Sequence, residues 1–187
     1  MRQARPHRLE PPWLPLRRLR HGEVSVGSLD WLRDQGSLTR KVVQRCGGRF
    51  RVQVLEQGWT QPLPGEGLLL DMAQRQTAML REVLLLCNEV PWVFARTLIP
   101  ASTLQGAGRR LAHLRDRPLG ALLFADPRVK RGALEVARLL PHHVLFRSAV
   151  DSLPVAPDAL WARRTLFQLE GRPLLVNEVF LPEIPES

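Results

Sequence analysis

Three charged side chains lie in segments that are otherwise apolar, and they are the strongest candidates for chemistry in this chain. Arg81 and Arg96 occur within Thr77–Pro100 (TAMLREVLLLCNEVPWVFARTLIP), and Glu178 occurs within Leu174–Phe180 (LLVNEVF). Burying an unpaired charge is costly, so such side chains imply either partners or a ligand. Because guanidinium groups bind carboxylates through two N–H donors, the arginines indicate a site for an anionic ligand.

The register of the first apolar segment decides whether the two arginines act together. Asn88 and Glu89 are turn-like and predict a β-hairpin with a two-residue turn. Side chains alternate between the faces of a strand, so this register sets Arg81 opposite Arg96 on one face. Like charges placed so repel one another, and an anion bound over both would relieve the repulsion. Two alternatives stay open: a three-residue turn would separate the arginines onto different faces, or both could face water.

A second hairpin is predicted at Ala162–Pro182, with its turn at Glu170 and Gly171. Its register places Glu178 opposite Arg163. The simpler interpretation of this pair is a cross-strand ion pair at a sheet edge. The functional interpretation is a carboxylate that faces a cavity together with the arginines.

The other polar and sulfur-containing side chains predict no second centre. Glu82 and Asn177 alternate with the candidate residues and are expected to contact solvent or loops. Cys46 and Cys87 lack the spacing of a zinc site and are expected to be reduced core or helix-end residues. The pair His142-His143 falls in an expected loop. No metal site is therefore predicted.

The elements that would position these residues make an α+β fold. Helices are predicted at Ser28–Gln35, Leu38–Cys46, Leu68–Ala73, Ala101–Arg117, Pro118–Phe124 and Arg131–Leu140. A strand is predicted at Arg49–Glu56, and Pro141–Asp158 is expected to be a long loop. Since hairpins pair antiparallel, the expected architecture is a single antiparallel sheet with helices packed on it.

Composition fits one globular domain with a basic N-terminal arm. The chain has 187 residues, of which 44% are hydrophobic and 24% charged. Its net charge is +9, and Met1–Arg20 holds six arginines and one glutamate, which is +5 of that total. We expect residues 1–25 to form a Pro/Arg-rich arm and residues 26–187 a single domain. A solvated arm is the expectation, and attraction to an anionic membrane or to nucleic acid is the alternative.

Taken together, several segments resemble the chorismate pyruvate-lyase family. They are Leu29–Thr39 (LDWLRDQGSLT), Leu80–Pro100 followed by Ser102-Thr103-Leu104, Pro118–Phe124 (PLGALLF) and Trp161–Pro182 (WARRTLFQLEGRPLLVNEVFLP). The resemblance implies an enzyme that converts chorismate to 4-hydroxybenzoate and pyruvate for ubiquinone biosynthesis. It also implies a buried site under helical flaps, slow product release, a monomer in the cytoplasm, and no metal or organic cofactor.

The resemblance assigns roles to particular residues. Arg81 would grip the ring carboxylate, and Glu178 would meet the ring hydroxyl either as a base or as a hydrogen-bond partner. Leu119 and Leu38 would contribute backbone contacts, although many relatives have methionine in place of Leu38. Arg96 is a further candidate, as ligand of the substrate's second carboxylate.

Two other functions are compatible with parts of the sequence. A non-catalytic module of the same fold, such as the effector domain of a transcription regulator, would bind a small acid without converting it. The segment before the first expected helix is expected to be too short for an accompanying winged-helix domain. A basic nucleic-acid-binding protein would explain the charge, but it leaves Glu178 in an apolar row unexplained. We therefore expect no nucleic-acid partner.

Overall fold

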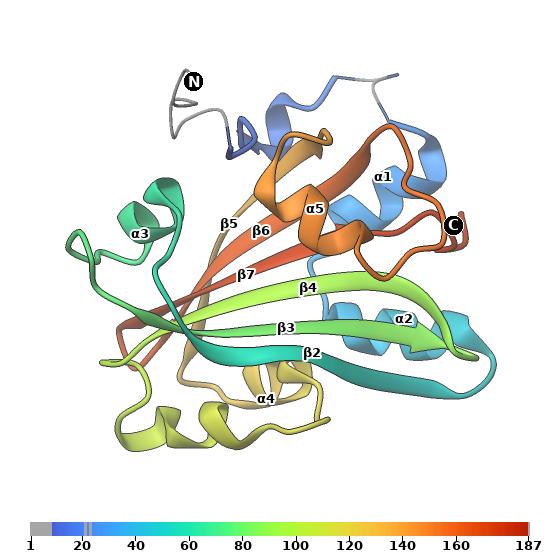
Figure 1. The fold of residues 1–187 in the computed structure, drawn as a ribbon. Coiled ribbons are helices and arrows are strands. Elements are labelled where there is room, and N and C mark those ends of the chain that lie inside the picture. Colours follow the sequence, from blue (N-terminus) through green and yellow to red (C-terminus); the bar gives the residue numbers. More distant parts are fainter. Residues whose placement is uncertain (1–8, 21, 23, 187) are drawn as a thin grey trace.

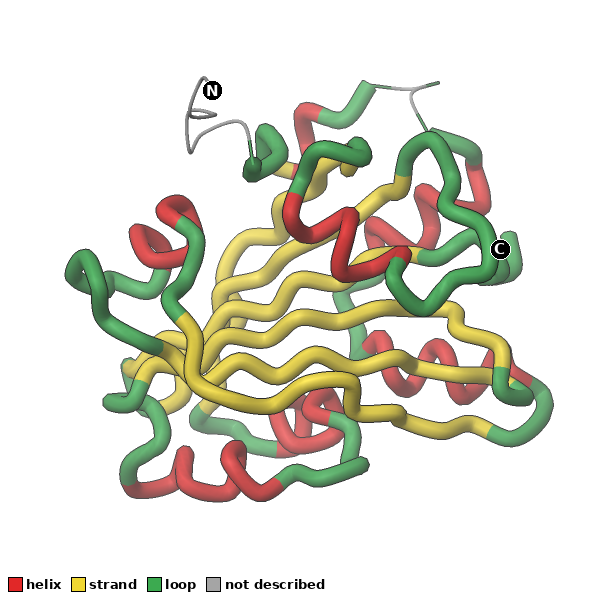
Figure 2. The backbone as a smooth tube through the Cα atoms, viewed as in Figure 1, coloured by secondary structure: helices red, strands yellow, loops and turns green. Residues whose placement is uncertain are grey.

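One antiparallel sheet of seven strands organises the molecule (Figures 1 and 2). The computed structural model describes residues 9–20, 22 and 24–186. The strand order is β1-β5-β6-β7-β4-β3-β2. The strands are β1 Leu14–Pro15, β2 Phe50–Thr60, β3 Ala78–Cys87, β4 Val90–Pro100, β5 Val129–Leu139, β6 Leu160–Leu169 and β7 Arg172–Phe180. The predicted α+β class with a single antiparallel sheet is confirmed.

Helices cover both faces of this sheet. The α-helices are α1 Val26–Arg33, α2 Leu38–Cys46, α3 Pro64–Leu69, α4 Leu119–Ala125 and α5 Val144–Val150, and Leu16–Arg18 and Gly106–His113 form 3-10 helices. The face that carries Arg81 packs against α1, α2 and α4 and is called the pocket face below. The face that carries Arg96 packs against α5 and α3 and is called the opposite face. Within the described ranges, no helix has the length and apolar character needed to cross a membrane.

Local sequence explains the elements nearest to the site. The Ser37 hydroxyl accepts a hydrogen bond from the Arg40 N–H and begins α2, and Gly47 ends α2 with a φ of 56°. Both hairpin turns lie where they were predicted, because each central pair adopts the left-handed conformation that a two-residue turn requires. The φ values are 49° and 67° at Asn88-Glu89, and 52° and 78° at Glu170-Gly171.

Several predicted elements are wrong. The helix expected at Arg131–Leu140 is strand β5, because β1 and β6 pair with it on either side. A register shift between Arg131 and Leu134 breaks the alternation that would have identified a strand. The loop expected at Pro141–Asp158 contains α5, and the helical turn expected at Leu68–Ala73 begins earlier, as α3.

Part of the basic arm is packed rather than solvated. Leu14 pairs with Val136 of β5, and Leu19 is buried. The Arg164 guanidinium lies 4.6 Å from the centroid of the Trp13 ring. The expectation of a solvated terminus is thus wrong for Trp13 and Leu19, whereas Arg17 and Arg18 are exposed as expected, and residues 1–8 of the arm lie outside the described residues.

The expectation of reduced cysteines is also wrong. Cys46 and Cys87 form a disulfide, with their Cα atoms 5.5 Å apart and a sequence separation of 41. The bond joins the last turn of α2 to the end of β3. Nothing in the local sequence marks the pair, because the packing of α2 on the sheet is what brings the two thiols together.

Candidate functional site

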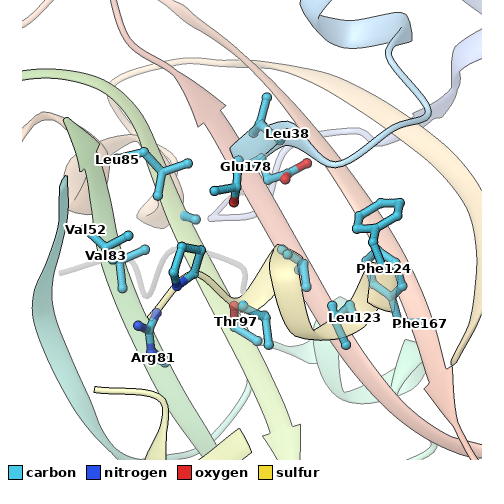
Figure 3. Close-up of a pocket in the computed structure, with 16 residues that line it drawn as sticks. Leu38, Val52, Arg81, Val83, Leu85, Thr97, Leu123, Phe124, Phe167 and Glu178 are labelled. Carbon is cyan, nitrogen blue, oxygen red and sulfur yellow. The ribbon is translucent and has the colours of Figure 1, made fainter. Parts of the chain in front are cut away.

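A pocket lies between the pocket face of the sheet and helices α2 and α4 (Figure 3). The cavity it encloses is small, about 50 Å³. Apolar side chains dominate its wall, and the polar groups are few. The lining residues are Leu38, Thr39, Val52, Arg81, Val83, Leu85, Ala95, Thr97, Pro118, Leu119, Gly120, Leu123, Phe124, Phe167, Val176 and Glu178. The four residues that the family resemblance singled out, Leu38, Arg81, Leu119 and Glu178, are among them.

Because side chains alternate between the two faces of a strand, every second residue of β3 and of β7 faces the pocket. Arg81, Val83 and Leu85 are alternate residues of β3, and Val176 and Glu178 are alternate residues of β7. Arg81 and Glu178 therefore project into the same space from different strands (Figure 3).

The two covering helices approach each other closely at Gly120 of α4. A Cβ atom at this position would lie 3.0 Å from Thr39 Oγ1 and 3.2 Å from Ser37 Oγ. Glycine at 120 thus allows α4 to meet the start of α2 over the pocket. The P-L-G sequence places Leu119 and Gly120 at this junction, directly after the proline that precedes the helix.

Arg81 is a buried cation, and one of its hydrogen-bond donors has no partner among the described residues. Its side chain is 2% exposed, and Nη2 donates to the backbone carbonyls of Arg115 (2.7 Å) and Arg117 (3.2 Å). Its Nε has no hydrogen-bond partner among the described residues. Burial lowers the pKa of Arg81, and the nearby charge of Asp116 acts in the opposite direction. A buried donor without a partner is costly, so an anionic ligand would complete this side chain.

Glu178 faces the pocket while bound to an arginine. Arg163 Nε donates to Glu178 Oε2 at 2.5 Å, and the predicted opposition of the two residues is confirmed. Arg163 is 1% exposed, and its Nη1 also donates to the carbonyls of Trp31 (2.9 Å) and Asp34 (2.6 Å). The simpler interpretation holds in part, since the ion pair exists. It is not at a sheet edge, because β6 and β7 are interior strands.

The prediction that Arg96 reaches the ligand is wrong. The β3–β4 register shifts between Leu85 and Leu86, so Glu82 pairs with Arg96 and Arg81 pairs with Thr97. This single-residue bulge moves Arg96 to the opposite face. There its Nη1 donates to Glu82 Oε1 at 2.8 Å and its Nε donates to Glu66 Oε1 at 3.2 Å.

Glu82 and Asn177 are buried, contrary to the expectation that they contact solvent or loops. Their exposed fractions are 7% and 1%. Asn177 Nδ2 donates to Glu66 Oε1 at 3.3 Å, so α3 inserts Glu66 between Asn177 and Arg96. Glu66 was not predicted from the sequence. The one feature that could have indicated a role for Glu66 is its position in the first turn of a helix that begins at Pro64.

The histidines and carboxylates give no indication of a metal centre. Across residues 9–20, 22 and 24–186, no three His, Cys, Asp or Glu side chains are placed to hold an ion. His143 is buried, and its Nδ1 accepts a hydrogen bond from the Leu140 N–H. This contact gives His143 a structural role before α5.

Comparison with known sequences points to one family. Residues 12–186 match the family model described as chorismate lyase. The chain is 46% identical over 160 residues to a probable chorismate pyruvate-lyase of Methylococcus capsulatus, covering 84% of this chain and 98% of that protein. It is 45% identical over 186 residues to a probable chorismate pyruvate-lyase of Aromatoleum aromaticum, covering 98% of each.

Solved structures with a similar fold include regulator domains of low sequence identity. The effector domain of PhnF from Mycobacterium smegmatis superposes with a TM-score of 0.59 at 12% identity, covering 82% of this chain and 94% of that one. The ligand-binding domain of a putative GntR-family regulator from Bordetella bronchiseptica gives 0.53 at 18% identity, covering 75% and 88%. These similarities show a shared fold.

Proposed function

Because the chain belongs to the chorismate lyase family, we propose that it is a chorismate pyruvate-lyase that releases 4-hydroxybenzoate for ubiquinone biosynthesis. The observation that carries the proposal is the pocket that contains both Arg81 and Glu178. Its wall is otherwise mostly apolar, as a site for a six-membered carbon ring requires.

Arg81 would bind the ring carboxylate of chorismate. Its guanidinium is held by two backbone carbonyls, so its direction is fixed before the ligand arrives. The unpartnered Nε supplies a donor for a carboxylate oxygen. The charge on the ligand would also compensate the cost of burying this cation.

Glu178 would meet the C4 hydroxyl of the ring, either as a hydrogen-bond acceptor or as a base. Arg163 balances its charge at 2.5 Å, which lets an ionised carboxylate persist inside an apolar pocket. In the reaction the C3–O ether bond breaks, and its electron pair leaves with the enolpyruvate oxygen. The C4–H electrons form the new ring double bond, and the released proton ends on the departing enolpyruvate, which becomes pyruvate.

The backbone at Leu38 and Leu119 would contact the ring's substituents from above. These two residues begin α2 and α4, the two helices that meet over the pocket at Gly120. A ligand enclosed there is shielded from water and held in one conformer, which favours an intramolecular elimination. The same closure would make product release slow, since the two helices must part.

An assay with chorismate tests this proposal directly. Purified protein without added metal, and in the presence of a chelator, should convert chorismate to equimolar pyruvate and 4-hydroxybenzoate, each identified by mass. Stoichiometric binding of chorismate or 4-hydroxybenzoate without turnover would contradict the proposal. That outcome would support a non-catalytic small-acid-binding module of the same fold.

We further propose that the protein acts in the cytoplasm as a monomer, as the family resemblance implies. Light scattering coupled to size-exclusion chromatography tests the second point. A mass near the chain mass of 21.3 kDa is expected, and a stable dimer would contradict it.

A further inference from the structure

A third arginine, Arg131 of β5, borders the pocket from the side away from Arg81. Its guanidinium carbon lies 5.6 Å from the ring centroid of Phe124 and 5.8 Å from that of Phe167. Both rings line the pocket. Nη1 of Arg131 also donates to the backbone carbonyl of Gln35, in the turn that leads into α2. One side chain thus contacts the two lining rings and the segment that covers them.

No carboxylate closely neutralises Arg131. Within the described part of the chain, no ion pair with an N–O distance of 4.0 Å or less involves it. The nearby carboxylates have other partners: Glu178 lies 2.5 Å from Arg163, and Asp34 lies 3.4 Å from Lys41. Burial and the charge of Arg163 lower the pKa of Arg131, while Glu178 and Asp34 act in the opposite direction. Arg131 therefore extends a positive potential toward the pocket.

The charged residues of the pocket face come from strands spread across the sheet. Arg81 lies on β3, Glu178 on β7 and Arg131 on β5, and the strand order is β5-β6-β7-β4-β3. Chorismate carries its ring carboxylate at one end, the C4 hydroxyl at the other, and the enolpyruvyl carboxylate on the neighbouring carbon. With the ring carboxylate at Arg81 and the hydroxyl at Glu178, the C3 substituent projects to one side of the line between them, and a ring turned with C3 toward β5 would direct the second carboxylate to Arg131.

Two other buried arginines of the sheet, Arg96 and Arg163, are already bound to carboxylates. Arg96 lies on the opposite face, bound to Glu66 and Glu82. Arg163 is committed to Glu178 and to two backbone carbonyls.

On the premise that the protein acts on chorismate, we propose that Arg131 is the positioning and specificity residue for the enolpyruvyl carboxylate. It acts through its charge across the rings of Phe124 and Phe167, in surroundings that screen charges less than water does. The substrate is a dianion, and the aromatic product keeps one carboxylate after pyruvate has left. Arg131 therefore favours binding of the substrate and contributes little to retention of the product.

The test compares the effect of charge removal on the two ligands. Arg131→Gln should lower kcat/KM for chorismate about 10- to 30-fold, as expected when one partly screened charge is removed, and change the Kd of 4-hydroxybenzoate less than about threefold. Arg131→Lys should retain most of the chorismate activity. Lys130→Gln is the matched control, because Lys130 is exposed, adjacent in sequence and pairs with Gln168 on the other face. It should change neither quantity.

Equal losses for the two ligands in Arg131→Gln would overturn the proposal, since they would indicate only a structural clamp on Gln35. An unchanged kcat/KM would overturn it as well. Failure of the proposed function is a separate outcome, recognised when the unmodified protein binds but does not convert chorismate. In that case calorimetric Kd values for chorismate and 4-hydroxybenzoate provide the same comparison: a selective loss for the dianion supports the role of Arg131, and an equal loss refutes it.

Discussion

The hairpin β3–β4 buries two arginines on its two faces, and the two have opposite surroundings. Arg81 and Arg96 are 2% and 7% exposed. Arg96 lies between Glu66 and Glu82, with N–O distances of 3.2 and 2.8 Å. Arg81 has two backbone carbonyls and an Nε without a partner among the described residues. On one face of this hairpin, the protein thus supplies carboxylate partners for the guanidinium of Arg96. On the other face, the guanidinium of Arg81 keeps a donor without a protein partner among the described residues.

This difference separates a structural cation from a ligand-binding one. Burial acts to lower the pKa of both arginines. For Arg96 the charges and hydrogen bonds of Glu66 and Glu82 outweigh burial, and its pKa is raised. For Arg81 burial prevails, and its pKa is lowered. A buried charge like that of Arg81, which lacks a carboxylate partner in the described part of the protein, is typical of a site where a ligand supplies that partner.

The largest expected effect lies on the opposite face. Arg96→Met would leave Glu66 and Glu82 buried without their cation, and should lower the free energy of unfolding by about 3–5 kcal/mol. Urea denaturation followed by tryptophan fluorescence measures this loss. The activity per folded molecule should change little.

If Arg96→Met fails to fold, Arg96→Lys keeps the charge and should show a smaller loss. A large fall in kcat at unchanged stability for Arg96→Lys would contradict the division between the faces. That result would indicate that Arg96 belongs to the substrate-binding site.

Arg81→Gln should show the converse pattern. Removing the anion-binding cation should lower kcat/KM for chorismate about 10²–10³-fold. The unfolding free energy should change by less than about 2 kcal/mol, because relief of the buried charge offsets the two lost hydrogen bonds to carbonyls. Steady-state kinetics and the same urea titration, run beside the Arg96 variants, measure both. Undiminished activity in a folded Arg81→Gln protein would refute the anion-binding role.

The sequence predicted the hairpins but not which face each arginine occupies. The turns at Asn88-Glu89 and Glu170-Gly171 were predictable, because a two-residue turn between apolar runs has a local signature. The bulge at Trp92, where Leu86 pairs with Pro91 and Leu85 with Val93, has none. One extra residue exchanges the faces, so the alternation correctly placed Arg81 and wrongly placed Arg96.

The residues of the candidate site that could be predicted are those marked by a strand pattern or by a family motif. Arg81 and Glu178 stood out as charges in apolar rows, and Leu38 and Leu119 came from the resemblance to a family. Thr97 and Phe167, which also line the pocket, gave no signal, since neither residue type is unusual in a strand. Arg131 was assigned to a helix, so its position beside the pocket could not be inferred. Such contacts depend on strand order and on helices that pack from distant parts of the chain.

The disulfide adds a test on the pocket face. Cys46 and Cys87 join α2, which covers the pocket, to β3, which carries Arg81. Replacing both cysteines with serine should lower the unfolding free energy by about 2–4 kcal/mol, because a bond between residues separated by 41 in sequence constrains the unfolded chain. A urea titration of the double variant against the unmodified protein, both without reductant, measures the loss. Reductant should bring the unmodified protein to the same stability, and a midpoint unaffected by reductant would contradict a contribution from this bond.

The smallest expected effect again concerns the face that carries Arg96, where His143 precedes α5. Burial first, and the charges of His142 and Arg147 next, lower the pKa of His143 below its ordinary value of 6.5. The unfolded chain then binds the proton more readily than the folded one. The contribution of His143 to stability is complete above about pH 6.5 and is lost as the pH falls from there toward the folded pKa.

The pH profile of the unfolding free energy should therefore be flatter below pH 6.5 in His143→Gln, whose amide oxygen can still accept the Leu140 N–H. His113→Gln is the matched control and should leave the profile unchanged. Because His143 lies away from the pocket, its substitution should not alter the pH dependence of kcat/KM in the folded protein. An altered kinetic profile would show that the two faces are coupled, and would weaken the separation of binding from stability that the two arginines define.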